Sequence, residues 1–227
     1  LNLPALCIVL FVISILIRGT KGAAKANNFI VVLKVSAIIF VIIAGIFFIN
    51  VDNWMPFIPA ATTITENGVS HPAYGISGVV SGASAKKLAN VGFVAVSTQA
   101  GEAINPKKDV PFAIITSLIV CTVLYILVSL VLTGMMHYTD FNPLGKYPDA
   151  IKAPVAYAFD IAGQAWAGYI ITIAATIGLI SVLMVMIMGQ SRIFLGMSKD
   201  GLIPKTFSKV NPTTGVPKKN LMILGAI

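Results

Sequence analysis

The sequence predicts an all-α fold, a polytopic transmembrane helical bundle, from three observations. Apolar residues make up 57% of the 227 residues. Charged residues make up only 11%, against roughly 25% in an average globular domain, so the charged shell of a water-soluble protein is missing. The apolar residues are gathered into long runs, and the mean hydropathy is +0.90. These features exclude a soluble enzyme, a nucleic-acid-binding protein and a disordered tail.

Hydropathy alone identifies the clearest membrane spans, because a spanning helix needs about 20 mostly apolar residues. The clear runs are residues 3–17, 29–49, 110–136 and 165–195, and residues 221–227 are the start of a further, incomplete one. These runs contain few charges: Lys34 lies early in the second run and Arg192 near the end of the fourth.

Neither the cysteines nor the histidines form a recognisable site. Cys7 and Cys121 lie inside apolar runs, and His71 and His137 have no partner motif, so no disulfide, metal site or cofactor is predicted. The chain opens with Leu1 and shows no signal peptide. We therefore expect a piece of a longer membrane protein, whose missing helices are partners from the same chain.

Residues 78–103 are the difficult segment, since glycines and the Lys86-Lys87 pair leave hydropathy undecided. The positive-inside rule decides it. If this segment crosses the membrane, eleven Lys and Arg residues fall on one side and only Lys146 and Lys152 on the other, whereas otherwise the split is five against eight. The segment is therefore predicted to span. The cytoplasmic loops are then residues 18–25, 105–109 and 198–219, and the outer loops are residues 50–77 and 137–164.

A glycine-rich span has two explanations. Irregular backbone at membrane depth is tolerated where it lines a cavity, and freed backbone groups there bind polar substrates. The break would fall at residues 91–94. Alternatively, the glycines only permit close helix packing, as in the small-xxx-small pair Gly78 and Gly82. The residues alone leave both explanations open.

Several motifs resemble one family of membrane proteins. Gly92-Phe93-Val94-Ala95-Val96-Ser97-Thr98, then Glu102 and the sequence NPKKDVP at 105–111, resemble the sixth helix and following loop of amino-acid permeases. Asn27-Asn28 with Lys34 is similar to the fifth helix, and residues 189–204 are similar to the end of the eighth. The superfamily is that of the amino acid–polyamine–organocation transporters, and the nearest branch is the bacterial relatives of cationic amino-acid transporters. The resemblance covers essentially the whole chain.

The resemblance implies a fold of two inverted five-helix repeats with a discontinuous sixth helix. This chain would supply helices four to eight and the start of nine. The implied function is non-enzymatic: secondary active amino-acid transport in the bacterial inner (plasma) membrane, by alternating access and proton symport. The implied partners are an amino-acid substrate, protons and the lipid bilayer, with no nucleic acid. The alternatives are an amino acid–polyamine exchanger, a non-transporting protein derived from a permease, and a decayed fragment.

Lys34 is the most informative charge. A lysine near the middle of a spanning helix costs about 2.5–3.5 kcal/mol, so it usually faces a cavity or a partner. By resemblance, Lys34 would gain and lose the coupled proton, and Ser181 would lie beside it. The alternatives are that Lys34 snorkels to the cytoplasmic interface and that Ser181 only packs between helices.

The predicted substrate site lies at the break. By resemblance, backbone groups around Asn90, Val91, Gly92, Phe93 and Val94 would bind the amino acid, with Phe93 as an aromatic wall, although an ordinary core phenylalanine is the alternative.

An inner gate is predicted from Glu102 and Arg192, which would pair near the cytoplasm. The alternative is that Glu102 is a solvated carboxylate at the interface.

The Lys86-Lys87 pair departs from the family pattern, in which bulky apolar residues stand at that position. Three explanations stay open: a changed substrate preference in which cationic side chains are repelled, local decay, or an outward aqueous vestibule.

Overall fold

The computed structural model describes residues 3–66, 69–85, 103, 105–141, 147, 150, 152–212 and 214–226. These residues form two compact units. The first unit contains the described parts of Leu1–Phe40, Ser97–Pro111 and Tyr169–Ile227, and the second contains those of Val41–Val96 and Phe112–Gly168. The boundaries cut the three longest helices, so each unit holds a portion of each of them.

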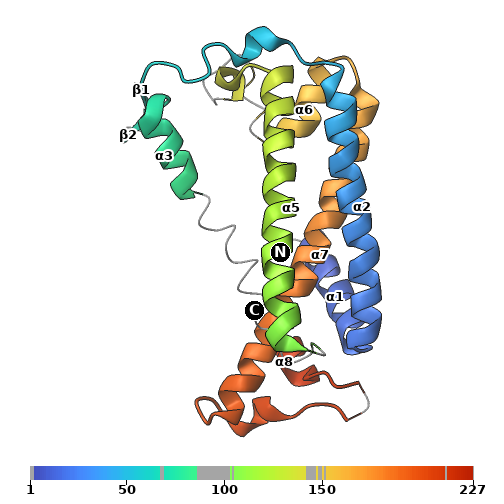
Figure 1. Cartoon of the computed structure of the whole chain (residues 1–227). Helices are drawn as coiled ribbons and strands as arrows, with labels where there is room; N and C mark the ends of the chain where they lie inside the picture. Colours follow the sequence, from blue (N-terminus) through green and yellow to red (C-terminus); the bar gives the residue numbers. More distant parts are fainter. Residues whose placement is uncertain are drawn as a thin grey trace. The chain divides into compact units, whose positions relative to one another are not determined.

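Helices dominate the described chain (Figure 1). In order they are α1 (Leu3–Ile17), α2 (Thr20–Ile46), α3 (Gly75–Ala85), α5 (Pro106–Met135), α6 (Pro154–Ile161), α7 (Ala165–Lys199) and α8 (Lys218–Ala226). Single turns of 3-10 helix are η1 (Val51–Trp54), η4 (Tyr138–Phe141) and η6 (Lys205–Ser208). The strands β1 (Thr62–Glu66) and β2 (Val69–Ala73) form an antiparallel hairpin in which Thr62 pairs with Ala73.

Three described helices are long and apolar enough to cross a bilayer. They contain the candidate spans Gly22–Ile46, Pro106–Met135 and Ala165–Lys199. Their outer surfaces carry exposed apolar side chains such as Phe29 and Phe112, both 71% exposed, which suit a lipid environment better than water. The predicted class, a helical transmembrane bundle, is confirmed. The division of the chain into individual spans stays a prediction, because much of residues 78–103 lies outside the described residues.

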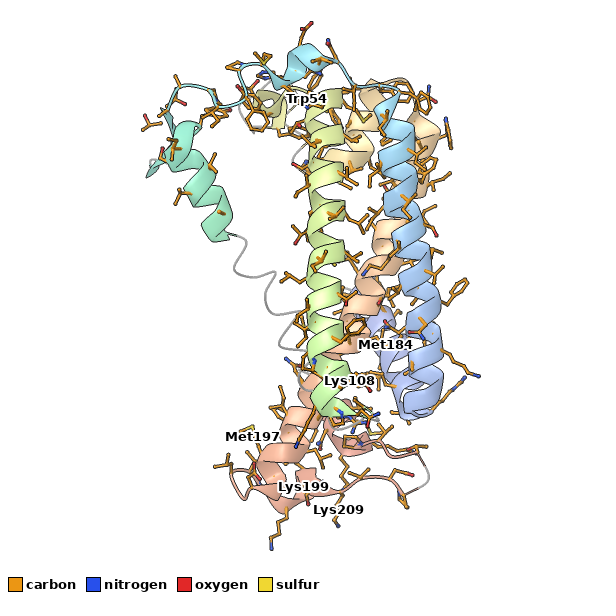
Figure 2. The ribbon with its side chains drawn as sticks, in the orientation of Figure 1. Trp54, Lys108, Met184, Met197, Lys199 and Lys209 are labelled. Atoms are coloured by element: carbon orange, nitrogen blue, oxygen red, sulfur yellow. The ribbon has the colours of Figure 1, made fainter. Side chains whose placement is uncertain are left out.

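The first unit has a core built from α1, α7 and α8. Val12, Leu16, Met184 and Leu221 are each at most 2% exposed and belong to one apolar cluster; Met184 is labelled in Figure 2. α1 and α8 approach closely at Gly225, where a Cβ atom would collide with the side chain of Ile13.

Buried polar contacts complete the end of this unit where α8 begins. Asn220 is fully buried, and its Nδ2 donates hydrogen bonds to the carbonyl oxygens of Ser191 (3.2 Å) and Phe207 (3.0 Å). The side chain of Ser198 likewise donates to the carbonyl of Pro204 at 2.8 Å. These bonds join α7, η6 and α8, so the loop between the two helices is held at several points.

The second unit is held together where η1 meets the last turns of α5. Asn53 Nδ2 donates to the carbonyl oxygen of Gly134 (2.7 Å), and Trp54 Nε1 donates to that of Leu130 (3.2 Å). Gly134 makes this approach possible, since a Cβ atom there would lie 2.9 Å from Ile49 Cγ2. A second contact forms where Gly45 faces the side chain of Val131.

Residues 50–77, expected only as an outer loop, contain η1 and the hairpin β1–β2. The sequence carries a signal for the hairpin, because Asn67-Gly68 directly follows Thr62–Glu66, a run rich in β-branched residues. Residues 137–164, also expected as an outer loop, contain η4 and α6. α6 begins with Pro154, which is well tolerated in the first turn of a helix.

Candidate functional site

Lys34 occupies the middle of the candidate span Gly22–Ile46. Its side chain is half-buried and lies across α7 at Gly178. A Cβ atom on Gly178 would be 3.3 Å from each of Lys34 Cγ, Cδ and Cε. The lysine stem therefore runs alongside the bare backbone of α7 instead of reaching away from it.

This geometry bears on the two explanations for Lys34. Either end of the candidate span is about 18 Å away along the helix axis, at 1.5 Å per residue, but the apolar run begins at residue 29, only about 7.5 Å before Lys34. The stem also contacts a neighbouring helix. Within the described part of the chain, no residue makes a hydrogen bond or ion pair with the Lys34 ammonium group. The contact with α7 fits a position inside the helical bundle, and the role of Lys34 stays a prediction beside the snorkelling alternative.

Ser181 meets a partner that the sequence did not indicate. Its hydroxyl is buried and donates a 2.6 Å hydrogen bond to Asn27 Oδ1, which joins α7 to α2. Asn27 lies two helical turns from Lys34, about 10 Å along the axis. Ser181 and Lys34 thus belong to the same helix–helix contact, but the hydrogen-bond partner of Ser181 is Asn27. The role of Ser181 in proton coupling stays a prediction.

An apolar cavity of about 350 Å³ lies between α2 and α7 next to this contact. Leu33 and Ile177, the sequence neighbours of Lys34 and Gly178, form one part of its wall, and the Ser36 hydroxyl is its polar side chain. The remaining lining residues are Ala37, Phe40, Ile170, Ile173 and Ala174. This cavity can hold hydrocarbon, but its walls carry no charged group for an ammonium or a carboxylate.

Arg192 lies near the end of α7, half-buried beside a cavity of about 10 Å³, which is room for about one water molecule. Ser191, Met188 and Leu16 line the same cavity. Glu102, its predicted partner in an inner gate, lies outside the described residues. The gate therefore stays a prediction.

The predicted substrate site also lies outside the described residues, which include neither Asn90 to Val94 nor Lys86 and Lys87. The described chain resumes in α5, whose start is well defined. Pro106 is its first residue, and the Asn105 backbone N–H donates to Asp109 Oδ2 at 3.1 Å. Both features are typical of a helix N-terminus, where proline needs no hydrogen-bond partner and a carboxylate is favourable.

A metal-ligand set is not found among the described residues, where no three His, Cys, Asp or Glu side chains gather. In the same part of the chain Cys7 and Cys121 are free thiols.

Sequence reasoning missed two members of the α2–α7 contact, Asn27 as a partner of Ser181 and Gly178 as the surface under Lys34. A signal for the first exists, since polar side chains in apolar helices often hydrogen-bond across helix interfaces. Glycines in apolar helices have many roles, so the sequence offers no comparable signal for Gly178.

Comparison with known proteins agrees with this architecture. The family model described as amino acid permease matches residues 2–227. A methylthioribose transporter of Bacillus subtilis is 39% identical over 226 residues, which are 100% of this chain and 44% of the relative. The branched-chain amino acid permease BcaP of the same organism is 37% identical over 216 residues (95% and 42%). Cationic amino acid transporter 9, chloroplastic, of Arabidopsis thaliana is 37% identical over 213 residues (94% and 34%).

The chain thus spans less than half the length of these relatives, and their names describe transporters, not enzymes. The matched family and the long apolar helices make it a multi-pass integral membrane protein. Because the family model matches almost every residue, the chain belongs to the amino acid permease family.

Proposed function

We propose that this chain is part of a secondary active amino-acid transporter that couples uptake to proton symport by alternating access. Lys34 carries the coupled proton. The observation that supports this role is the position of Lys34, in the middle of a candidate span and laid against the backbone of a second helix. A charged ammonium group at membrane depth is costly, so its charged and neutral forms favour different conformations of the surrounding helices.

The substrate site proposed for this transporter is the glycine-rich break around Asn90, Val91, Gly92, Phe93 and Val94. Unwound backbone and half-helix ends are the groups with which discontinuous helices bind polar substrates. Glu102 and Arg192 are proposed as its inner gate. Transport of this kind needs no covalent chemistry, and the bacterial inner membrane is its proposed location.

The coupling role predicts the behaviour of Lys34→Ala in the complete transporter, reconstituted in liposomes. In the unaltered protein, uptake should rise as the external pH falls, by up to about tenfold per pH unit for a one-proton step. Lys34→Ala should abolish this dependence, because the variant has no group to carry the proton. The measurement is initial uptake of labelled substrate between pH 5 and 8, with entrapped pyranine to follow protons.

Lys25→Ala is the matched control, because Lys25 lies on the same helix and is exposed. It should leave the pH profile unchanged. If Lys34→Ala retained the pH profile of the unaltered protein, the coupling role would be wrong. Uptake that requires internal substrate and moves no protons would instead identify an exchanger.

The substrate is identified by testing three compounds for binding: leucine, lysine and methylthioribose. Leucine and lysine represent the substrates named for the branched-chain and cationic relatives. Methylthioribose is a second candidate, because the transporter named for it is 39% identical over all of this chain. Competition of each unlabelled compound with the others at one site identifies the substrate class, and failure of all three to bind would favour a non-transporting protein.

A further inference from the structure

Gly178 differs from Gly168 and Gly196, two other glycines of α7, in what lies next to it. An added Cβ atom would meet three consecutive methylene carbons of Lys34, all at 3.3 Å. At Gly196, on the same helix, an added Cβ atom would meet nothing within 4 Å, and at Gly168 it would meet the carbonyl oxygen of Ala156 at 3.0 Å. A separation of 3.3 Å is shorter than an optimal carbon–carbon contact. The absence of a side chain at Gly178 is therefore what lets the lysine stem lie flat.

The neighbouring hydrogen bond fixes the register of this contact. Ser181 follows Gly178 by three residues, and Lys34 follows Asn27 by seven, so each pair shares one face of its helix. The two contacts, Asn27 with Ser181 and Lys34 with Gly178, run antiparallel along the two helices. Because a part-buried hydrogen bond holds one of them, sliding α7 to make room at the other would break that bond.

We propose that Gly178 is a positioning residue for Lys34: its bare backbone holds the stem against α7 and so places the ammonium group where the coupled proton is exchanged. This inference rests on the proposed function. A methyl group at this position would push the flexible stem away by a few tenths of an ångström without requiring the helix to unfold. The ammonium group would then leave its place.

The test compares Gly178→Ala, Lys34→Ala, the double variant and Gly196→Ala in the complete transporter. Gly178→Ala should lower proton-driven uptake about tenfold, the order of loss expected from a small misplacement of a reacting group. Substrate counterflow without a proton gradient should stay near that of the unaltered protein. Gly196→Ala, which adds the same methyl group into open space, should change neither measurement.

The double variant separates positioning from general damage. If Gly178 acts through Lys34, adding Gly178→Ala to Lys34→Ala should cause no further loss of proton-driven uptake, because the effects of substitutions at two residues in contact are not additive. If Gly178→Ala lowered uptake by the same factor in the unaltered protein and in Lys34→Ala, the proposal would be overturned. The probe is the compound among leucine, lysine and methylthioribose that shows counterflow.

A measurement that needs no substrate, the NMR signal of the Lys34 side chain, distinguishes the positioning role of Gly178 from the coupling role of Lys34. In protein labelled with ¹⁵N at the lysine side chains, the Nζ signal of Lys34 is the one missing from Lys34→Ala. Gly178→Ala should move this signal and Gly196→Ala should not. A signal unmoved in both variants overturns the positioning role whatever the transport result. A moved signal, with a pH profile that survives Lys34→Ala, overturns the coupling role alone.

Discussion

The hydrogen bond between Asn27 and Ser181 is a polar link between α2 and α7. It is 2.6 Å long, and the Ser181 side chain is 3% exposed. Hydrogen bonds between helices in membranes average about 0.6 kcal/mol and reach about 1.7 kcal/mol. Burial and the short distance place this bond toward the upper part of that range.

A double-mutant cycle of Asn27→Ala and Ser181→Ala should therefore show a coupling free energy of about 0.6–1.7 kcal/mol. The measurement is the free energy of unfolding in mixed micelles as sodium dodecyl sulfate is added. Thr176→Ala is the control, since the Thr176 hydroxyl donates to the carbonyl oxygen of Thr172 in its own helix, at 2.9 Å. A coupling no larger than that between Asn27→Ala and Thr176→Ala would mean that the bond does not stabilise the pair.

Lys34 and Gly178 show what residue-level reasoning can and cannot reach. A charge inside an apolar run stands out in the sequence because its cost in a membrane depends on little more than its depth. The contact with Gly178 depends on which faces of two helices meet. Those faces come from segments 144 positions apart in the numbering, so no local pattern reveals the contact.

At the scale of elements, the ends of α2 and α5 meet η1 through small residues. Gly134 leaves no room for a side chain, since an added Cβ atom would be 2.9 Å and 3.1 Å from the Ile49 side chain and 3.2 Å from the ring of Trp54. The hydrogen bond from Asn53 to the Gly134 carbonyl holds η1 at the same place. A larger residue here must displace either the helix or the turn.

Gly134→Ala should lower the free energy of unfolding by about 1–3 kcal/mol, the usual cost of overpacking. It should also change the fluorescence of Trp54 in a Trp166→Phe background, because the added methyl group contacts that ring. Gly22→Ala is the control, with nothing within 4 Å of the added atom. It should be neutral or stabilising by up to about 1 kcal/mol through helix propensity. Equal stability of the two variants would refute this packing argument.

Element boundaries differ from the hydropathy pattern for a physical reason. α2 begins at Thr20 and α5 at Pro106, each several residues before the apolar run it contains. Hydropathy detects the part of a helix that suits lipid, whereas the helix itself continues into water wherever hydrogen bonds and capping allow. The hairpin β1–β2 and α6 were not predicted, because a search for long apolar runs passes over short elements.

At the scale of the whole molecule, charge determines the predicted orientation. Lys108, Lys199 and Lys209 lie at the same end of the first unit (Figure 2). All three belong to the eleven cations assigned to the cytoplasm, as a positive-inside orientation requires. The crossing by residues 78–103 is the part of this topology that needs an independent test.

Cysteine labelling provides that test. Ser77→Cys and Lys108→Cys, each in a Cys7→Ala/Cys121→Ala background, should react with a membrane-impermeant maleimide from opposite sides of the membrane. Ser77 should react in intact cells, and Lys108 only in inverted vesicles. Both positions are exposed, so failure to react would not come from burial. Reaction of both variants from one side would contradict the crossing and, with it, the assignment of the sixth helix.

The amino-acid sequence by itself determined the helical membrane class and the family, and it singled out Lys34 as the candidate for proton coupling. These follow from hydropathy, charge and local motifs, which act through composition and neighbours along the chain. Only the tertiary structure decided that Ser181 bonds to Asn27 and that Gly178 supports the stem of Lys34. Such contacts depend on the register and rotation of two packed helices, and these are set by the fit of many side chains at once.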